Sequence, residues 1–449
     1  MIYLPNNELE MAMITRNRAK FVAEWLEDNF KALSQRNIRL SIWDSSDNDD
    51  TQAVVMSYCR SHECQIRYET VSPSMAVGHK MVVPLLGVKA NYVWPVADRR
   101  AFFWQEIDEK VLPLLRFGFD SIALQLKGFH AYEKIFTDLD AYSCASISAI
   151  GAAGMSMFST RIFSFIRDND KVCNEYEQRY AYAKGFAFVG YVYEALARSK
   201  GLNVVTTLQQ LKLSKQQSHC HWLKDYAQIV YHELPRLCDN LPEVYKHRSN
   251  LPRIVVQETQ SVYQKWIMQA VIAGGITKED IRFIEENCIL ERLYTPEQIP
   301  GVKSCMALSP QEAAVALQSY DDGYNDINRQ YISEIFKKHI QPHINGRKLI
   351  IWGMGVQSQH VVAYLASIGL DIAVYVDKNA ANMPLEGGLN VVSPDNIGGP
   401  GAYYVIITTR NKYGEMWDIL QRKGYRERDF FWIFQGLDEY MKEHEFHEW

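Results

Sequence analysis

Residues 9–47 read LEMAMITRNRAKFVAEWLEDNFKALSQRNIRLSIWDSSD, and this stretch decides the fold class of the first part of the chain. A short apolar run covers 9–15, and a polar turn ends it. The apolar residues of 20–33 then recur near the helical period. A second apolar run, 38–44, leads into the turn-rich sequence SSDNDD. Strand, helix and strand in this order predict a βαβ unit.

The same alternation continues to about residue 96. We expect a helix over 51–62, a strand over 65–70, a helix over 75–90 that is interrupted near Pro84, and a strand over 91–96. Helices between successive strands predict a largely parallel, doubly wound sheet. Ligands of such sheets bind at the carboxyl ends of the strands. The charged residues at those ends are Arg18, Asp44, Asp47 and Asp98.

Length and composition predict a multidomain globular protein. The 449 residues are 47% hydrophobic and 22% charged, and the net charge of -5 argues against a general nucleic-acid binder. The eight cysteines form no CxxC pair and are typical of reduced thiols. We find no secretory signal at the start and no apolar stretch of transmembrane length. These features predict a cytoplasmic protein without an integral membrane segment.

Two further regions follow the first one. Residues 236–343 are mainly of helical character, with Thr277 and Asp280 spaced as a capping box and Pro310 at the first position of a helix. A new βαβ rhythm begins at Lys348. We therefore predict an α/β protein with domains at 1–235, 236–343 and 344–449.

The N-terminal motifs resemble those of family-2-type glycosyltransferases, which have a GT-A fold. Thr15-Arg16-Asn17-Arg18 is similar to the first element of that family, a strand that ends in Thr-x-Asn-Arg. The sequence WDSSD at 43–47 is similar to the second, and Asp98 to the start of the third. The resemblance covers roughly the first 100 residues.

The resemblance implies roles for these residues. Asp44 would contact the nucleotide base, Asp47 the ribose, and Arg18 the phosphates, where a planar guanidinium suits bidentate contacts. Thr15 and Lys80 would also line the nucleotide site. Taken singly, an Asp after a strand is most often a turn or cap residue.

The third motif departs from the family pattern. The family usually has two or three carboxylates there, the last of which ligates Mg²⁺ or Mn²⁺, whereas this chain reads Asp98-Arg99-Arg100. Arg99 or Arg100 could neutralise the diphosphate directly. Alternatively Asp98 alone ligates a metal, and both arginines face solvent.

The resemblance also implies a general base for an inverting transfer. Four acids in 167–178 lie in the right part of the chain: Asp168, Asp170, Glu175 and Glu177. A polar stretch of this kind is commonly a solvated loop. The catalytic candidates are Asp98, Asp168 and Glu175.

The C-terminal region contains a second nucleotide-type motif. Gly353-x-Gly355-x-x-Ser358 follows an apolar run, and Asp377 closes the next one. The region resembles small Rossmann-like domains appended to bacterial sugar-modifying enzymes, although Ser358 replaces the third glycine. A nucleotide ligand and a purely structural module both remain open.

The resemblance implies transfer of a sugar from a nucleotide-sugar donor to a glycan or lipid-linked glycan acceptor, with a cellular role in bacterial surface polysaccharide synthesis. Peripheral contact with the inner face of the membrane and homo-oligomer formation are left open. One alternative is a nucleotide-cofactor-dependent sugar-modifying enzyme that uses the C-terminal domain. Another is an inactive sugar-nucleotide-binding assembly protein.

Overall fold

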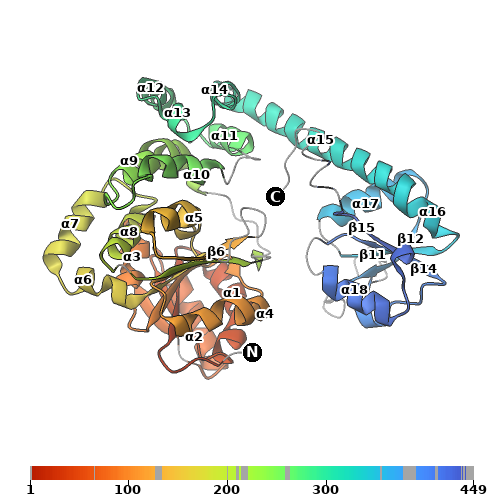
Figure 1. Ribbon diagram of the computed structural model, residues 1–449, viewed down its shortest axis with the longest axis horizontal. Coiled ribbons are helices and arrows are strands. Elements are labelled where there is room, and N and C mark those ends of the chain that lie inside the picture. The colour runs from red at the N-terminus through yellow and green to blue at the C-terminus, as the bar shows by residue number, and fades with distance from the viewer. Residues whose placement is uncertain are drawn as a thin grey trace. The chain divides into compact units, whose positions relative to one another are not determined.

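The structure is a computed structural model with two compact units, Met1–Pro310 and Gln311–Trp449 (Figure 1). It describes residues 3–64, 66–126, 134–199, 201–208, 212–213, 221–257, 263–353, 356–377, 391–409, 413–435, 437 and 440. The predicted α/β class is confirmed, with a doubly wound N-terminal sheet, a helical middle region and a parallel C-terminal sheet.

An eight-stranded sheet in the order β3-β2-β1-β4-β8-β6-β9-β7 forms the centre of the first unit. Its strands are β1 Leu9–Thr15, β2 Arg39–Asp44, β3 Arg67–Thr70, β4 Tyr92–Ala97, β6 Ser121–Leu126, β7 Lys134–Phe136, β8 Ser156–Ser159 and β9 Asn203–Leu208. The four strands predicted from the sequence are parallel neighbours. Beyond them, β8 runs antiparallel to both β4 and β6.

Helices cover both faces of this sheet. The principal ones are α1 Ala19–Ser34, α2 Asp50–Ser61, α3 Val77–Gly87, α5 Leu139–Gly151 and α8 Ala187–Ser199. Right-handed crossovers put α1 and α2 on one face, because β1, β2 and β3 follow in one direction. The chain then reverses, and α3, α5 and α8 lie on the other face (Figure 1). Pro84 lies inside α3 and does not end it.

Short elements complete the sheet domain. They are β5 Arg100–Ala101, paired with β10 Lys212–Leu213, and the helices α4 Trp104–Glu106, α6 Ser164–Arg167 and α7 Asp170–Tyr180. Two π-helices, Ile107–Val111 and Gln228–Glu233, and three 3-10 helices, Leu112–Phe117, Thr160–Phe163 and His221–Asp225, belong to this domain as well.

The helical middle region is confirmed. It consists of α9 Leu234–Asp239, α10 Leu251–Gln257, α11 Tyr263–Ile272, α12 Lys278–Glu286, α13 Ile289–Leu293, α14 Ile299–Met306 and α15 Pro310–Ile335, with a short turn at Arg248–Asn250. The predicted capping box is present, since Thr277 and Asp280 exchange backbone-to-side-chain hydrogen bonds. The longest helix, α15, begins at Pro310 as expected.

The second unit contains a five-stranded parallel sheet in the order β13-β12-β11-β14-β15. Its elements are β11 Lys348–Trp352, α17 Val356–Ser367, β12 Ile372–Val376, β13 Val391–Val392, β14 Tyr403–Ile407, α18 Tyr413–Arg422 and β15 Phe430–Trp432, preceded by Phe336–Ile340 and α16 Gln341–Ile344 and joined by turns at Pro394–Asn396 and Glu427–Asp429. Alternate residues of β11 belong to two separate apolar cores, one with α17 and one with α18. Both faces of the sheet are therefore buried, which explains the unbroken apolar runs.

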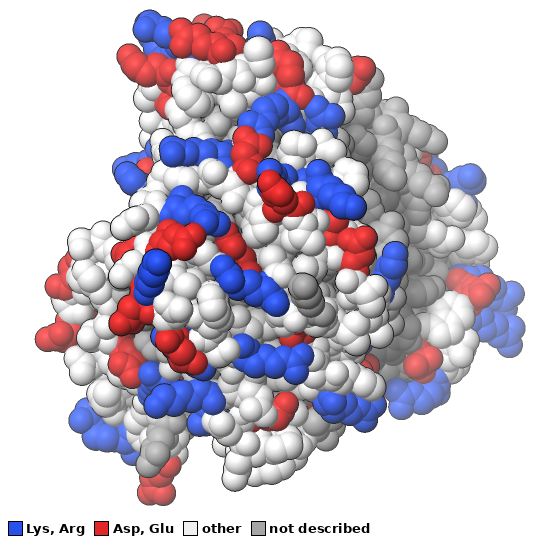
Figure 2. All heavy atoms as spheres, turned by 60° about the vertical axis from the view of Figure 1, so that its left-hand side comes forward, with Lys and Arg blue, Asp and Glu red and all other residues white. Residues whose placement is uncertain are grey.

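Surface features agree with the composition. On the face shown in Figure 2, Lys and Arg side chains alternate with Asp and Glu side chains, without one large basic field. In the part of the chain that the structure describes, no helix combines the length and the apolar character needed to cross a membrane.

Candidate functional site

The carboxyl ends of β1, β2 and β4 lie side by side at one edge of the first sheet. Thr15, the last residue of β1, pairs in register with Asp44 at the end of β2. On the other side, Ile14 pairs with Ala97, so Asp98 follows next to Thr15. The predicted gathering of Thr15, Asp44 and Asp98 at one edge is thus what the strand order produces.

Asp98 is the most buried charged group of this edge, with 2% of its surface exposed. The Thr15 hydroxyl donates to Asp98 Oδ2 at 2.7 Å, and a guanidinium nitrogen of Arg18 lies 3.0 Å from Oδ1. Arg18 is the residue immediately before α1, and its side chain contacts Asp98 from there. Burial raises the pKa of Asp98, although Arg18, Thr15 and Arg99 act in the opposite direction. Burial therefore disfavours the charged form of Asp98.

Asp44 is buried too, and its hydrogen bonds are made within the protein. The backbone N–H and hydroxyl of Ser46 donate to Asp44 Oδ1, and the Tyr68 hydroxyl donates to Oδ2. Burial and the contact with Asp44 raise the pKa of Tyr68. These bonds leave Asp44 little capacity for a base edge, and they fix the turn that presents Asp47.

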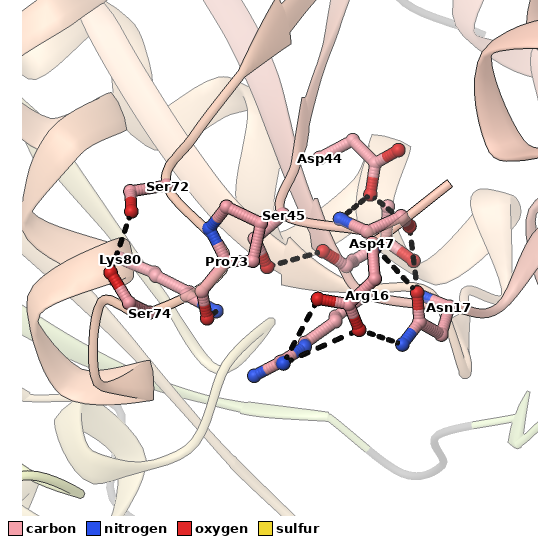
Figure 3. A network of polar contacts seen from close by, with 11 residues as sticks. Arg16, Asn17, Asp44, Ser45, Asp47, Ser72, Pro73, Ser74 and Lys80 are labelled. Atoms are coloured by element: carbon pink, nitrogen blue, oxygen red, sulfur yellow. Dashed lines mark hydrogen bonds and ion pairs between the residues drawn. The ribbon is translucent and has the colours of Figure 1, made fainter. Parts of the chain in front are cut away.

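Asp47 is exposed and lies in a polar network with the first motif, as Figure 3 shows. Asn17 Nδ2 donates to Asp47 Oδ2 at 2.6 Å, and Asn17 Oδ1 accepts from the backbone N–H of Asp47 at 2.9 Å. Arg16 lies 3.4 Å from the same carboxylate. Asn17, with Arg16, lowers the pKa of Asp47. The carboxylate is thus ionised and accessible, as a ribose contact requires.

Lys80 lies on α3 beside this network (Figure 3). Its side chain is 4% exposed, and Nζ donates to the Pro73 carbonyl at 3.2 Å. Burial lowers the pKa of Lys80, and Arg16 lowers it further, while Asp47 and Asp44 raise it. Lys80 is therefore close enough to interact electrostatically with Arg16 of the first motif and with Asp44 and Asp47 of the second.

Of the two arginines after Asp98, the structure describes the side chain of Arg99 and only the backbone of Arg100. Arg99 lies in the turn between β4 and β5, and its Nε is buried without a hydrogen-bond partner among the described residues. Arg100 begins β5, and its side chain lies outside the described residues.

The residues at this edge fit a divalent cation poorly. Mg²⁺ and Mn²⁺ take several oxygen ligands. Asp98 offers one carboxylate, both oxygens of which already have partners, and one partner is a cation. No group of three or more His, Cys, Asp and Glu side chains within the described residues could hold a metal ion.

The candidate general bases lie on or next to α6 and α7, where their neighbours are other charged residues. Asp168 follows α6 and pairs with Arg167 at 3.1 Å, and Glu175 pairs with Arg179 at 2.6 Å within α7. Both side chains are exposed, as are Asp170 and Glu177. No direct contact joins any of the four to Arg18 or Asp98 among the described residues, so their catalytic role stays a prediction.

The C-terminal motif lies at the carboxyl end of β11. Gly353 has φ +110, and a Cβ at this position would lie 3.1 Å from Thr408 Oγ1. Ser358 is buried in α17, and the backbone N–H of Asp377 donates to the Val392 carbonyl at 3.1 Å. Gly355 lies outside the described residues. A nucleotide at this end stays a prediction.

Tyr68 and Thr408 were not predicted from the sequence as parts of these two strand ends, and Ser46 was predicted only as a turn residue of the second motif, without its hydrogen bonds to Asp44. Ser46 and Thr408 follow strands at turn positions, which was the available signal. Tyr68 gave none, because a tyrosine within a strand is ordinary.

Comparison with known proteins found no family profile and no curated sequence that match the chain. Solved structures with similarity include S. aureus TarS 1-349 in complex with UDP-GlcNAc, at 12% identity, covering 70% of this chain and 92% of that one, with a TM-score of 0.41. The mannosyltransferase PcManGT from Pyrobaculum calidifontis in complex with GDP-Man and Mn²⁺ has 10% identity, 70% and 89% coverage and a TM-score of 0.37. Glucosyl-3-phosphoglycerate synthase from Mycobacterium tuberculosis, in complex with Mn²⁺, UDP and glucosyl-3-phosphoglycerate, has 13% identity, 52% and 80% coverage and a TM-score of 0.36. Identities and TM-scores this low leave the function to be inferred from the site geometry.

Proposed function

We propose that this chain is a glycosyltransferase that moves a sugar from a nucleotide-sugar donor to a hydroxyl of a glycan or lipid-linked glycan. The observation that carries the proposal is the convergence of Thr15, Asp44 and Asp98 at the carboxyl edge of three parallel strands, with Arg18 paired to Asp98. Ligands of doubly wound sheets bind at such an edge. The cellular setting that we propose is bacterial surface polysaccharide synthesis in the cytoplasm.

Each group has a defined part in donor binding. Asp47 accepts hydrogen bonds from the ribose hydroxyls, because it is exposed and ionised at the edge of the site. Asp44 acts as a positioning residue, because its hydrogen bonds hold the Ser46 turn that presents Asp47. Arg18 donates to phosphate oxygens from the start of α1.

The reaction is balanced without a redox partner. The bond between the anomeric carbon and the phosphate oxygen breaks, and its electron pair leaves with the nucleoside diphosphate. The acceptor oxygen forms the new bond to the anomeric carbon and loses its proton to a base. Asp168 and Glu175 remain the base candidates for an inverting transfer.

Binding and turnover test the proposal. We expect UDP-, GDP- or CMP-linked sugars to raise the melting temperature of the full chain and to release the nucleotide when a glycan acceptor is present. Asp47→Asn should lower donor affinity roughly tenfold, as expected for one lost charge-assisted hydrogen bond. Glu27→Gln, at an exposed position on α1, is the matched control and should behave like wild type.

Two results would contradict the proposal. A melting shift with NAD(P) alone that is the same in Asp47→Asn and in wild type would move the chemistry to the C-terminal unit, where Gly353 follows β11. Binding of sugar nucleotides without turnover for any glycan acceptor would indicate an inactive binding protein.

A further inference from the structure

We propose that side-chain cations, Arg18, Arg99 and Lys80, neutralise the donor's diphosphate, and that donor binding requires no divalent metal. This inference rests on the proposed function and defines how the same site holds the phosphates.

The first step concerns Asp98, the only carboxylate of the third motif. Its two oxygens accept from Thr15 at 2.7 Å and from Arg18 at 3.0 Å. A divalent ion would have to displace the Thr15 hydroxyl or the guanidinium. It would also lie beside Arg18 and Arg99, and close like charges repel strongly in a buried site. The position therefore favours anions over a metal.

The second step concerns the cations that lack a carboxylate partner. Arg16 pairs with Asp47 and Arg18 pairs with Asp98. Neither Arg99 nor Lys80 forms an ion pair with a carboxylate in the described parts of the chain. Among the described residues of this edge, four cations (Arg16, Arg18, Arg99 and Lys80) therefore face three carboxylates (Asp44, Asp47 and Asp98). The edge has an excess of one positive charge, which attracts a diphosphate.

The third step concerns the buried Nε of Arg99. A buried donor without an acceptor is rare in folded proteins and costs free energy. Arg99 is also close enough to Asp98 to lower the pKa of that carboxyl. Nε has no acceptor among the described residues, so in the donor complex that we propose the Arg99 side chain turns and takes a phosphate oxygen beside Asp98 as its acceptor, in the bidentate geometry that guanidinium groups favour.

The surrounding backbone adds to this preference. The sixteen-residue helix α1 starts directly after Arg18 and has no acidic side chain in its first turn. Its N-terminal partial charge is therefore positive and unopposed by its own first-turn side chains. Charge stabilisation of the leaving diphosphate needs a fixed cation, and these side chains provide several.

Titration calorimetry on the full chain with UDP and with GDP tests the inference. We expect the dissociation constant of the nucleotide that binds to agree within about twofold between EDTA and Mn²⁺ buffers. Binding that appears only with Mn²⁺ would overturn the inference while the proposed function stands. Absence of binding for every nucleotide and nucleotide sugar in both buffers would remove the proposed function and this inference with it.

Variants make the test independent of turnover. Arg99→Gln should weaken diphosphate binding roughly tenfold in EDTA and leave the affinity for the free nucleoside unchanged. The control is Arg60→Gln, an exposed arginine of α2. Equal diphosphate affinity of Arg99→Gln and wild type would overturn the role of Arg99.

Asp98→Asn separates the two ways of holding phosphate. If side-chain cations hold the diphosphate, this variant should bind it at least as tightly as wild type, because the substitution removes one negative charge beside the phosphates. With a metal, it would lose its carboxylate ligand and bind far more weakly. A fall of more than about tenfold, with an unchanged melting temperature, would overturn the inference.

Discussion

Each unit of the protein contains an arginine–aspartate pair at the edge of its sheet. The pKa of the aspartate is lowered in one pair and raised in the other. In the C-terminal unit, Arg347 lies 2.7 Å from Asp429, which also accepts from the backbone N–H of Arg426 at 2.9 Å. These partners lower the pKa of Asp429 despite partial burial. In the N-terminal unit, Arg18 lies 3.0 Å from Asp98, yet burial raises the pKa of Asp98.

The difference lies in what surrounds each carboxylate. Asp429 caps a turn, and its arginine is further held by the carbonyls of Ile344 and Pro400. Asp98 has a hydroxyl and one guanidinium, and it is more deeply buried. A charge that the fold stabilises is a structural element, whereas a charge kept against its burial cost is a candidate for function. The predictions below test this distinction.

Asp44→Ala should have the largest effect on stability. The substitution leaves the Ser46 N–H and the Tyr68 hydroxyl without their acceptor in a buried site. We expect a loss of about 3 kcal/mol in the free energy of unfolding of the first unit, at the upper end for unsatisfied donors. Hydrogen exchange of the β1 and β2 amides measures it. Asp44→Asn is the control and should lose less, and equal losses would contradict the hydrogen-bond explanation.

Asp429→Ala should destabilise the second unit by about 2 kcal/mol, because it removes a turn cap and leaves Arg347 without its partner. Exchange of the β14 amides reports the change. The effect should disappear in acid: the pKa of Asp429 is lowered in the folded state, so its stabilisation is present above its ordinary value of 3.8 and is lost as pH falls through the folded value. A penalty that persists at low pH would contradict the charge argument.

Gly353→Ala tests the C-terminal strand end with a smaller change. Ala is strained at φ +110, and its Cβ would lie 3.1 Å from Thr408 Oγ1, so we expect a loss of about 1.5 kcal/mol. Gly369→Ala is the matched control, since Gly369 has φ +71 with no neighbouring atom within 4 Å. It should lose about 1 kcal/mol from backbone strain alone. Similar losses in β11 exchange protection would show that the Thr408 contact is unimportant.

The sequence was sufficient for the parallel half of the first sheet. Apolar runs separated by helical patterns identified β1 to β4 and their parallel pairing, whereas the strand order β3-β2-β1-β4 is known from the structure. The strands β6 and β9 were missed because they pair with each other across about 80 residues. Such a pairing depends on contacts that no local pattern records.

The site was predictable at the level of strand ends and not at the level of contacts. The strand pattern was enough to expect Arg18, Asp44, Asp47 and Asp98 at the carboxyl ends of the strands, whereas the Thr15–Asp98 hydrogen bond is known from the structure. The Tyr68–Asp44 hydrogen bond and the burial of Lys80 depend on side-chain directions and on the turn at Pro73. No local sequence pattern reveals either of them. Asp44 illustrates the consequence, since its hydrogen bonds to Ser46 and Tyr68 could not be read from the sequence, while its contact with a base stays a prediction.

Asp98→Asn should have the smallest effect on stability, within about 1 kcal/mol at neutral pH, because an amide oxygen still accepts from Thr15 and the 28% exposed Arg18 side chain can be hydrated. The pH dependence is the sharper readout. The pKa of Asp98 is raised in the folded state, so its protonated form contributes stability below its ordinary value of 3.8 that is lost as pH rises through the folded value. Wild type should therefore lose stability relative to Asp98→Asn as pH rises over that acidic range, opposite to Asp429. If wild type instead gains stability there, Asp98 is a structural charge like Asp429, and the contrast between the two pairs fails.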